Sequence, residues 1–293
     1  MSRLATPMMG CAMPLIVRHP PLRPGLPGHD PRHLPRRCLA RGLPSLLSDA
    51  ISPSSPTRDL LAAAFAITGS KLIVQIFDRL EAAAIIDRNL SRKLVHTLAG
   101  PLFLVSWPLF ASNPESKLIA AAVPFLNVIR LTLVGTGLVR DERVVAAMSR
   151  TGDKSELLRG PLFYVLVLFA VTLACWRNSP IGLVVIAVLC GGDGLADIFG
   201  RRFGGGARLP WNQAKSWAGS AAMLGGSLLV AASLISFYHL LGLVPHSLQD
   251  SLGPVAIIAA VSTGVESLPI SQRLDDNLSV PAVALLLGST LLP

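Results

Sequence analysis

Two acidic residues, Asp193 and Asp197, follow directly after the apolar run that ends at Leu189. They are four residues apart, so they share one face if the helix continues through them. Carboxylates in this arrangement can bind Mg²⁺ together with waters and phosphate oxygens. The alternative is a solvated loop in which acid–arginine pairs keep the segment soluble. Because ionisable groups beside a membrane span are costly, we interpret the two acids as functional and predict that they hold a metal.

Glycines and cations surround these two acids. Gly192 and Gly194 flank Asp193 and leave the backbone open to close approach by a ligand. Cations lie on both sides of a flexible glycine-rich turn, residues 204–206. These cations are Arg201, Arg202 and Lys215. Carboxylates, bare backbone and cations in one segment suit a metal-bound polyphosphate, so we predict that these residues bind nucleotide phosphates.

The composition is that of an integral membrane protein. The chain has 293 residues, of which 51% are hydrophobic and only 15% are charged, and its mean hydropathy is +0.56. A soluble domain carries about 25% charged residues. Four cysteines show no paired spacing, so the sequence predicts neither a disulfide framework nor a CxxC metal site.

Residues 1–58 are predicted to be a disordered transit peptide. They contain 11 of the 23 prolines and eight arginines but only two acids. Proline at this density prevents a regular amphipathic helix, and the acid-poor, Pro- and Ser-rich composition favours plastid targeting. The alternative is a disordered cytoplasmic tail. This segment carries +6 of the net charge of +9, so the basic isoelectric point gives no case for nucleic-acid binding.

Residues 59–293 are predicted to form one all-α domain, a polytopic transmembrane helical bundle of about eight spans. The apolar segments are 60–77, 95–110, 117–138, 160–176, 181–199, 217–241, 254–270 and 280–292. Several are shorter than the ~20 residues that cross a bilayer comfortably. The second and the last are therefore candidates for tilted or partly re-entrant helices.

Eight spans place nearly all cationic loop residues on one side. Loops 78–94, 139–159, 200–216 and 271–279 contain 14 Lys and Arg residues, whereas the opposite loops contain only Arg177. This asymmetry supports the span count, and it predicts that the charged side faces the stroma if this is a plastid protein and the cytosol otherwise. The same loops collect most of the acids, which contribute little to orientation. We therefore predict an aqueous active site on one face of a multi-pass chloroplast membrane protein.

Three polar residues lie inside predicted spans. Asn127 and Arg130 share a face of the third span, and Glu266 lies in the seventh. An arginine at membrane depth costs at least ~2.5 kcal/mol, which predicts that Arg130 pairs with an acid or a phosphate unless it snorkels to the charged side. For Glu266 the candidate partner is His96.

Common nucleotide-binding and hydrolytic motifs are absent from the sequence. It contains no Walker-type loop, protein-kinase set, GxSxG elbow or HExxH. The glycine pair around Asp193 follows an apolar helix and not a strand, so it is not a dinucleotide fingerprint. A transporter that uses Arg130 and Glu266 as intramembrane charges is a non-enzymatic alternative, although the chain shows no inverted repeats with broken helices.

The segment 190–220 resembles the signature of the polyprenol kinase family, and more closely that of the plant phytol and farnesol kinases of plastids. The wider pattern of this segment is also similar to CDP-diacylglycerol synthases and dolichol kinases. This pattern is an acid, a helical turn, a second acid, a basic glycine-rich turn and then Lys-x-Trp-x-Gly. The likeness covers essentially all of residues 60–293. Further matching pieces are residues 92–96, Asn127-x-x-Arg130, residues 152–161, residues 265–269 and residues 275–277.

The resemblance implies a CTP-dependent lipid-alcohol kinase that phosphorylates phytol and feeds tocopherol biosynthesis. UTP as donor, and geranylgeraniol or farnesol as acceptor, are alternatives. Mg²⁺ on Asp193 and Asp197 would neutralise the phosphates, and either Asp153 or Glu156 would accept the alcohol proton. The apolar bundle, embedded in membrane lipid, would bind the prenol chain. A membrane cytidylyltransferase of the CDP-diacylglycerol synthase type is the enzymatic alternative.

Overall fold

The computed structural model describes residues 56–269 and 274–292. Nearly all of the predicted transit peptide therefore lies outside the described residues, as does Arg273. The boundary between a leader and a membrane domain near residue 58 stays a prediction. The first described helix, α2, begins at Pro56.

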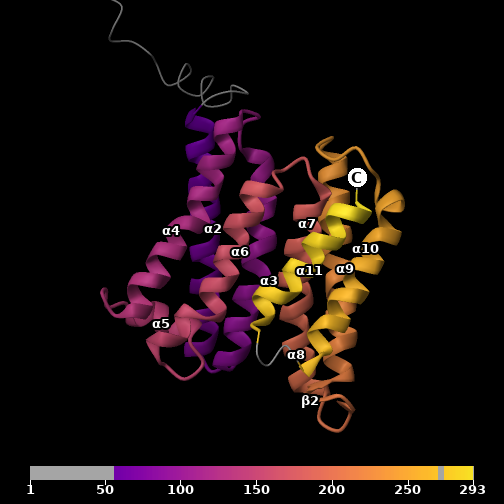
Figure 1. The fold of residues 1–293 in the computed structure, drawn as a ribbon. Coiled ribbons are helices and arrows are strands. Elements are labelled where there is room, and N and C mark those ends of the chain that lie inside the picture. The colour runs from indigo at the N-terminus through magenta and orange to yellow at the C-terminus, as the bar shows by residue number, and fades with distance from the viewer. Residues whose placement is uncertain (1–55, 270–273, 293) are drawn as a thin grey trace, which may run out of the picture. The chain divides into compact units, whose positions relative to one another are not determined.

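Eight long helical segments follow one another in the described residues and alternate in direction between the two ends of a bundle (Figure 1). They are α2 (Pro56–Ala82), α3 (Arg88–Ser106), α4 (Pro114–Thr136), α6 (Gly160–Ala174), α7 (Pro180–Ala187) continued through a π-helical turn (Val188–Gly192) into α8 (Asp193–Phe203), α9 (Trp217–Leu240), α10 (Leu248–Ser267) and α11 (Asp276–Leu291). Each coincides with one predicted span, so the predicted all-α bundle is confirmed.

Six of these segments are long and apolar enough to cross a membrane, when α6 is counted together with the 3₁₀ turn Lys154–Leu158 that leads into it. The two that fall short are α3, whose first turns are charged, and α11, which has only 16 residues. They are the second and the last predicted spans, the two that sequence length had already marked as unusual. Both bring polar residues to the same end of the bundle.

The charged loops meet at one end of the bundle, which we call the charged end (Figure 1). It carries the short helix α5 (Glu142–Met148), a 3₁₀ turn (Lys154–Leu158) and a small antiparallel hairpin of β1 (Arg208–Leu209) and β2 (Asn212–Ser216). The Asn212 side chain donates to the carbonyl oxygens of Ser267 and Leu268 at 3.1 and 3.2 Å. The segment after the glycine-rich turn is thus an ordered hairpin bound to the end of α10.

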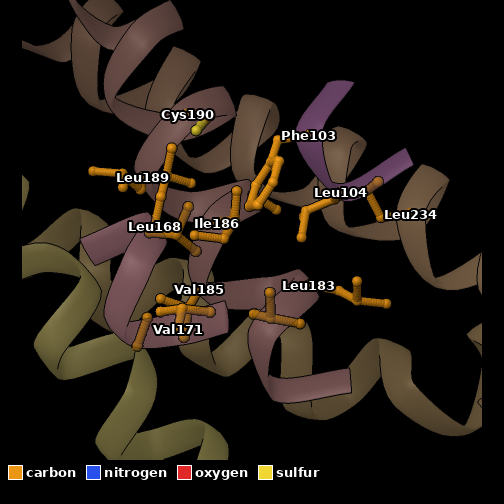
Figure 2. Packing of buried hydrophobic residues seen from close by; sticks show 14 of the residues in the cluster. Phe103, Leu104, Leu168, Val171, Leu183, Val185, Ile186, Leu189, Cys190 and Leu234 are labelled. Carbon is orange, nitrogen blue, oxygen red and sulfur yellow. The ribbon is translucent and has the colours of Figure 1, made fainter. Parts of the chain in front are cut away.

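The α7–α8 segment is the central helix of the bundle. In its most apolar stretch 78% of residues are buried, against 17–39% in the other five candidate spans. Leu183, Ile186 and Leu189 pack against side chains of α3 and α6 such as Phe103 and Leu168 (Figure 2). A helix that is apolar on all sides lies either in a protein core or in lipid, and here the neighbouring helices bury it. Its core position explains how the chain holds Asp193 at the charged end without exposing it to lipid.

Small residues let the neighbouring helices approach the central one closely. A side chain at Gly191 or Gly192 would collide with Val230 or Ser227 of α9, and one at Gly194 would collide with Thr97 of α3. This packing is a sufficient reason for glycine at each position. The predicted contact of Gly192 and Gly194 with nucleotide phosphates stays a prediction that the geometry does not support.

Candidate active site

Asp193 joins the central helix to α3. Its Oδ2 accepts a hydrogen bond from Nζ of Lys93 at 2.9 Å, and Nε2 of His96 lies 3.3 Å from the same oxygen. His96 Nε2 is also 3.1 Å from the carbonyl oxygen of Leu189, so this nitrogen faces two acceptors and carries the proton. Asp193 and Lys93 are 8% and 7% exposed. The pairing of His96 with Glu266 suggested by the sequence is wrong, because His96 contacts Asp193 instead.

Glu266 binds Lys215, the last charged residue of the hairpin. Nζ of Lys215 donates to Glu266 and, at 2.9 Å, to Oδ2 of Asp276 at the start of α11. Burial alone would lower the pKa of Lys215, but the two carboxylates raise it above its ordinary value. Lys215 is therefore a cation that already has two anionic partners, and it fastens the hairpin to α10 and α11.

The other cations predicted to hold phosphate lie on the last turns of α8. Nε of Arg201 donates to Oδ1 of Asp197 at 3.0 Å, an acid–arginine pair one helical turn apart. Arg202 is exposed, and its guanidinium carbon lies 5.9 Å from the ring centre of Phe203. Asp197 thus has a cation partner on its own helix, as the solvated-loop interpretation required, while Asp193 is bound by another helix.

Arg92 is a cation of the charged end that sequence reasoning gave no role. Its Nε and Nη2 are buried, and neither donates a hydrogen bond within the described residues. A buried polar group without a partner costs about 1–3 kcal/mol, and a charged one costs more. The charges of Arg150, Asp197, Arg201 and Asp193 all act on this guanidinium. Arg92 therefore lies inside the site with unused donors.

Unused acceptors lie at the start of α11. Oδ1 of Asp276 and Oδ1 of Asn277 are buried and accept no hydrogen bond within residues 56–269 and 274–292. Asp276 accepts from Nζ of Lys215 through its other oxygen, Oδ2, at 2.9 Å. Asp275 caps α11 by accepting from the backbone of Asn277.

Asp153 and Glu156, the candidate bases, lie in the loop that follows α5. Asp153 accepts from the backbone and hydroxyl of Ser155 at 3.0 and 2.6 Å, and these bonds lower its pKa. Glu156 accepts from the hydroxyl of Thr151 at 2.7 Å and from the backbone of Arg150. Both acids therefore order the loop, and their assignment as proton acceptors stays a prediction.

Asn127 and Arg130 do not take part in the ion pairs described above. Arg130 donates to Oδ2 of Asp141 at 2.6 Å, and its side chain is 50% exposed. The predicted acid partner exists, but the pair lies on the outer surface of α4. Asn127 is also exposed, and its amide lies 3.5 Å from the carbonyl oxygen of Val123.

The chemistry of the donors fits a hard divalent cation. In the described residues no three His, Cys, Asp or Glu side chains are grouped to hold a metal by themselves. Mg²⁺, however, commonly takes one or two carboxylates and completes its shell with water and phosphate oxygens. Oδ1 of Asp276 is an unused carboxylate oxygen, and Asn277 adds an unused amide oxygen. Asp193 is bound by Lys93 and His96 through Oδ2 alone.

Lys93, Arg92 and Asp276 are the site residues that sequence reasoning missed. The usable signal for Lys93 and His96 was their spacing, since residues three apart share a helix face. Arg92 and Lys93 were instead counted among the orientation-setting cations. Asp276 lies in the matching piece 275–277 and in one of the acid-containing loops, but these signals did not assign it a role.

Comparison with known proteins identifies close relatives in plants. The chain is 46% identical over 235 residues to probable phytol kinase 1, chloroplastic, of Glycine max, covering 79% of this chain and 78% of that protein. It is 42% identical over 262 residues to probable phytol kinase, chloroplastic, of Triticum aestivum, covering 87% of each. It is 41% identical over 242 residues to phytol kinase 1, chloroplastic, of Arabidopsis thaliana, covering 83% and 79%.

No family model and no solved structure matches the chain. The relatives are named chloroplastic, and six helices are able to span a membrane, so the predicted multi-pass chloroplast membrane protein is confirmed. The predicted kinase resemblance is confirmed as well. At this identity and coverage, the chain belongs to the family of plant chloroplast phytol kinases.

Proposed function

We propose that this protein transfers the γ-phosphoryl group of a nucleoside triphosphate, CTP in the first instance, to the primary hydroxyl of phytol. Membership of the phytol kinase family supports the acceptor. CTP as donor rests on the resemblance of the segment 190–220 to CTP-using lipid kinases. The product, phytyl phosphate, would feed tocopherol biosynthesis.

The observation that carries the proposal is the convergence of charge at one end of an apolar bundle. Lys93 of α3, Asp193 of the central helix, Lys215 of the hairpin and Asp276 of α11 come from four elements far apart in the sequence. Phosphoryl transfer requires little covalent chemistry from the protein and depends on positioned charges around the phosphates. A prenol in the lipid would present its hydroxyl at this same membrane boundary.

In the proposed reaction the phytol oxygen attacks the γ-phosphorus, the bond to the β-phosphate oxygen breaks, and the nucleoside diphosphate leaves. Lys93 and His96 hold the Asp193 carboxylate in place at the end of the central helix. Asp153 or Glu156 takes the proton of the hydroxyl. Mg²⁺, when bound, would neutralise charge on the phosphate oxygens.

The residues proposed to hold Mg²⁺ are Asp193 and Asp197, with Asp276 and Asn277 as further oxygen donors. Oδ1 of Asp276 and Oδ1 of Asn277 support the addition because both are buried acceptors without a hydrogen bond in the described residues. Asp197 is the weakest member of the set, since it is paired with Arg201.

The proposal is tested with the full-length protein in lipid nanodiscs. The protein is incubated with Mg²⁺, each of four nucleoside triphosphates, and phytol, geranylgeraniol or farnesol. Mass spectrometry measures the prenyl phosphate and the released nucleotide. We expect phytyl phosphate and CDP in equal amounts, and formation of no prenyl phosphate from any pair would overturn the proposal.

The same assay separates the alternatives. A cytidylyltransferase would release pyrophosphate and attach CMP to a phospholipid, so CDP would not form. A transporter would produce no covalent product from any of the pairs. Phytyl phosphate formed without matching release of nucleoside diphosphate would exclude direct γ-phosphoryl transfer.

A further inference from the structure

Arg92 is a half-buried cation that is left without an acid partner when the ion pairs of the charged end are assigned among the described residues. Lys93 binds Asp193, Arg201 binds Asp197, and Lys215 binds Glu266 and Asp276. Nε and Nη2 of Arg92 remain buried without an acceptor within the described residues. A guanidinium presents its N–H groups as a planar fork that matches the oxygens of a phosphate. The unused donors therefore point to an oxyanion ligand.

The packing of α3 places Arg92 between α5 and α8. One turn earlier, Arg88 donates two hydrogen bonds to the carbonyl oxygen of Ala146 in α5, at 3.0 and 2.7 Å. One residue later, Lys93 binds Asp193 at the start of α8. Arg92 thus lies between the loop that follows α5, which contains Arg150, and the helix that carries Arg201.

Positive charge from two other elements acts on this position. Burial lowers the pKa of Arg92, and the charges of Arg150 and Arg201 lower it further, while those of Asp197 and Asp193 raise it. Each of these two acids is already bound to a cation of its own. The buried unused donors of Arg92, on the α3 face between α5 and α8, are therefore suited to a ligand with several negative charges.

We propose that Arg92, Arg150 and Arg201 form the cluster that binds the triphosphate of the nucleotide. The choice of ligand rests on the proposed kinase function, which it deepens by naming the residues that hold the phosphates. It also revises the cations taken from the sequence. Lys215 is left out because its Nζ donates to two carboxylates, and Arg202 because its guanidinium lies over Phe203. Arg201 is kept because its hydrogen bond to Asp197 uses only Nε.

Binding of inorganic triphosphate and of CTP to the full-length protein in nanodiscs of neutral lipid tests the proposal. We expect Arg92→Gln to weaken the affinity for both ligands by about 10- to 100-fold, the loss of charge-assisted hydrogen bonds. Arg150→Gln, an exposed position that does not threaten the fold, should weaken it by at least about 5-fold. The matched control is Arg143→Gln, an exposed arginine on α5, which should bind both ligands normally.

Thermal unfolding separates a ligand-binding arginine from a structural one. Without ligand, Arg92→Gln should melt at the same temperature as the native protein or higher, because it removes a buried charge with unused donors. Triphosphate should raise the midpoint of the native protein and of Arg143→Gln but not that of Arg92→Gln. A lower midpoint without ligand, together with a normal shift on adding triphosphate, would mean that Arg92 is structural.

Two further outcomes would overturn the proposal. One is native affinity for triphosphate in both Arg92→Gln and Arg150→Gln. The other is a stabilising effect of phosphatidylglycerol nanodiscs equal to that of triphosphate and lost in Arg92→Gln, which would make the ligand a lipid headgroup. The proposed kinase reaction is judged separately by phytyl phosphate formation. If triphosphate binding depends on Arg92 but no phytyl phosphate forms, the proposed triphosphate site is supported and phytol is rejected as the acceptor.

Discussion

Arg92 at the charged end and Arg177 at the opposite end of the bundle, which we call the far end, differ in their hydrogen bonds. Arg177 is buried, and Arg92 is half-buried. At the far end, Nη1 of Arg177 donates to the carbonyl oxygen of Phe110 at 2.6 Å, and Nη2 donates to the hydroxyl of Ser112 at 2.9 Å. At the charged end, Nε and Nη2 of Arg92 donate to nothing within the described residues. Arg177 uses its donors to hold the connection between α3 and α4, whereas Arg92 keeps buried donors for a ligand.

The acids show the same contrast. At the far end both oxygens of Asp59 are used, by the backbone of Ala111 at 2.6 Å and by the hydroxyl of Ser116 at 2.7 Å. At the charged end Oδ1 of Asp276 accepts no hydrogen bond in the part of the chain that the structure describes. Charge alone therefore does not mark a functional site in this bundle. Neutral groups such as Nε1 of Trp107 are also buried without a hydrogen bond in the described residues, so the distinguishing feature of the charged end is that charged side chains keep unused donors and acceptors there.

The largest effect is expected for Asp193→Asn. The change removes a carboxylate from the centre of the proposed site and keeps its volume, so turnover of phytol should fall by more than about 100-fold. Because Lys93 would be left buried and uncompensated, Lys93→Met with Asp193→Asn serves as the variant that restores stability. Steady-state formation of phytyl phosphate is the measurement. More than a tenth of native turnover in Asp193→Asn would remove Asp193 from the site.

Arg177→Met should destabilise the fold at the far end without changing the affinity for nucleotide. It leaves the carbonyl oxygens of Phe110 and Ala111 without their donor, so the free energy of unfolding should fall by about 2–4 kcal/mol. Denaturation in detergent micelles measures the loss, and triphosphate affinity of the remaining folded protein is the control. A weaker affinity for triphosphate would mean that the two ends are coupled and would break the comparison.

Asp276→Asn tests whether the unused oxygen at the start of α11 belongs to a metal ligand. The substitution keeps the side-chain volume but removes the charge, so the apparent affinity for Mg²⁺ should fall by about 10-fold. Titration of Mg²⁺ at saturating nucleotide measures the effect in turnover, and binding of Mn²⁺ measures it directly. Ser279→Ala, on the same helix, is the matched control. Unchanged Mn²⁺ affinity would assign Asp276 to the Lys215 ion pair alone.

The smallest effect is expected for Arg130→Gln. The pair with Asp141 is half exposed on the outer surface of α4, and exposed ion pairs contribute about 0.2–1 kcal/mol. Comparison with Asp141→Asn and with the double variant isolates the energy of the pair. About 1 kcal/mol is the upper limit for exposed pairs. A coupling energy well above this value would show that Arg130, like Arg177, stabilises the fold through its hydrogen bonds.

Periodicity and hydropathy were sufficient to predict the eight long helical segments but not all of their ends. The helix α3 begins at Arg88 and α10 at Leu248, six or seven residues before the predicted spans. Periodicity and hydropathy also predicted that Asp193 lies at the end of a span, because an apolar run that continues into charge has few other interpretations. They did not predict the partners of the charged residues. Lys93 reaches Asp193 across 100 residues, and Lys215 reaches Asp276 across 61, so these pairs follow from tertiary packing.

The roles of glycines and arginines are also hard to predict from the sequence, for a physical reason. Glycine beside an acid fits close ligand approach and close helix packing equally well, and only the positions of Thr97 and Ser227 distinguish the two. Arg92 and Arg202 are the same residue type in similar charged stretches. One is held between α5 and α8 with unused donors, and the other lies on the surface beside Phe203.

The central claim is that the charged end binds the nucleotide and the far end does not. Single cysteines at Ala146 and Ala207 of the charged end, and at Asn178 of the far end, are exposed positions for a membrane-impermeant thiol reagent. Cys11 and Cys38 are replaced by serine, while Cys175 and Cys190 are buried. We predict that CTP with Mg²⁺ slows labelling at Ala146 and Ala207 and leaves Asn178 unchanged. Equal labelling rates with and without nucleotide at both charged-end positions, or protection of Asn178, would contradict the account.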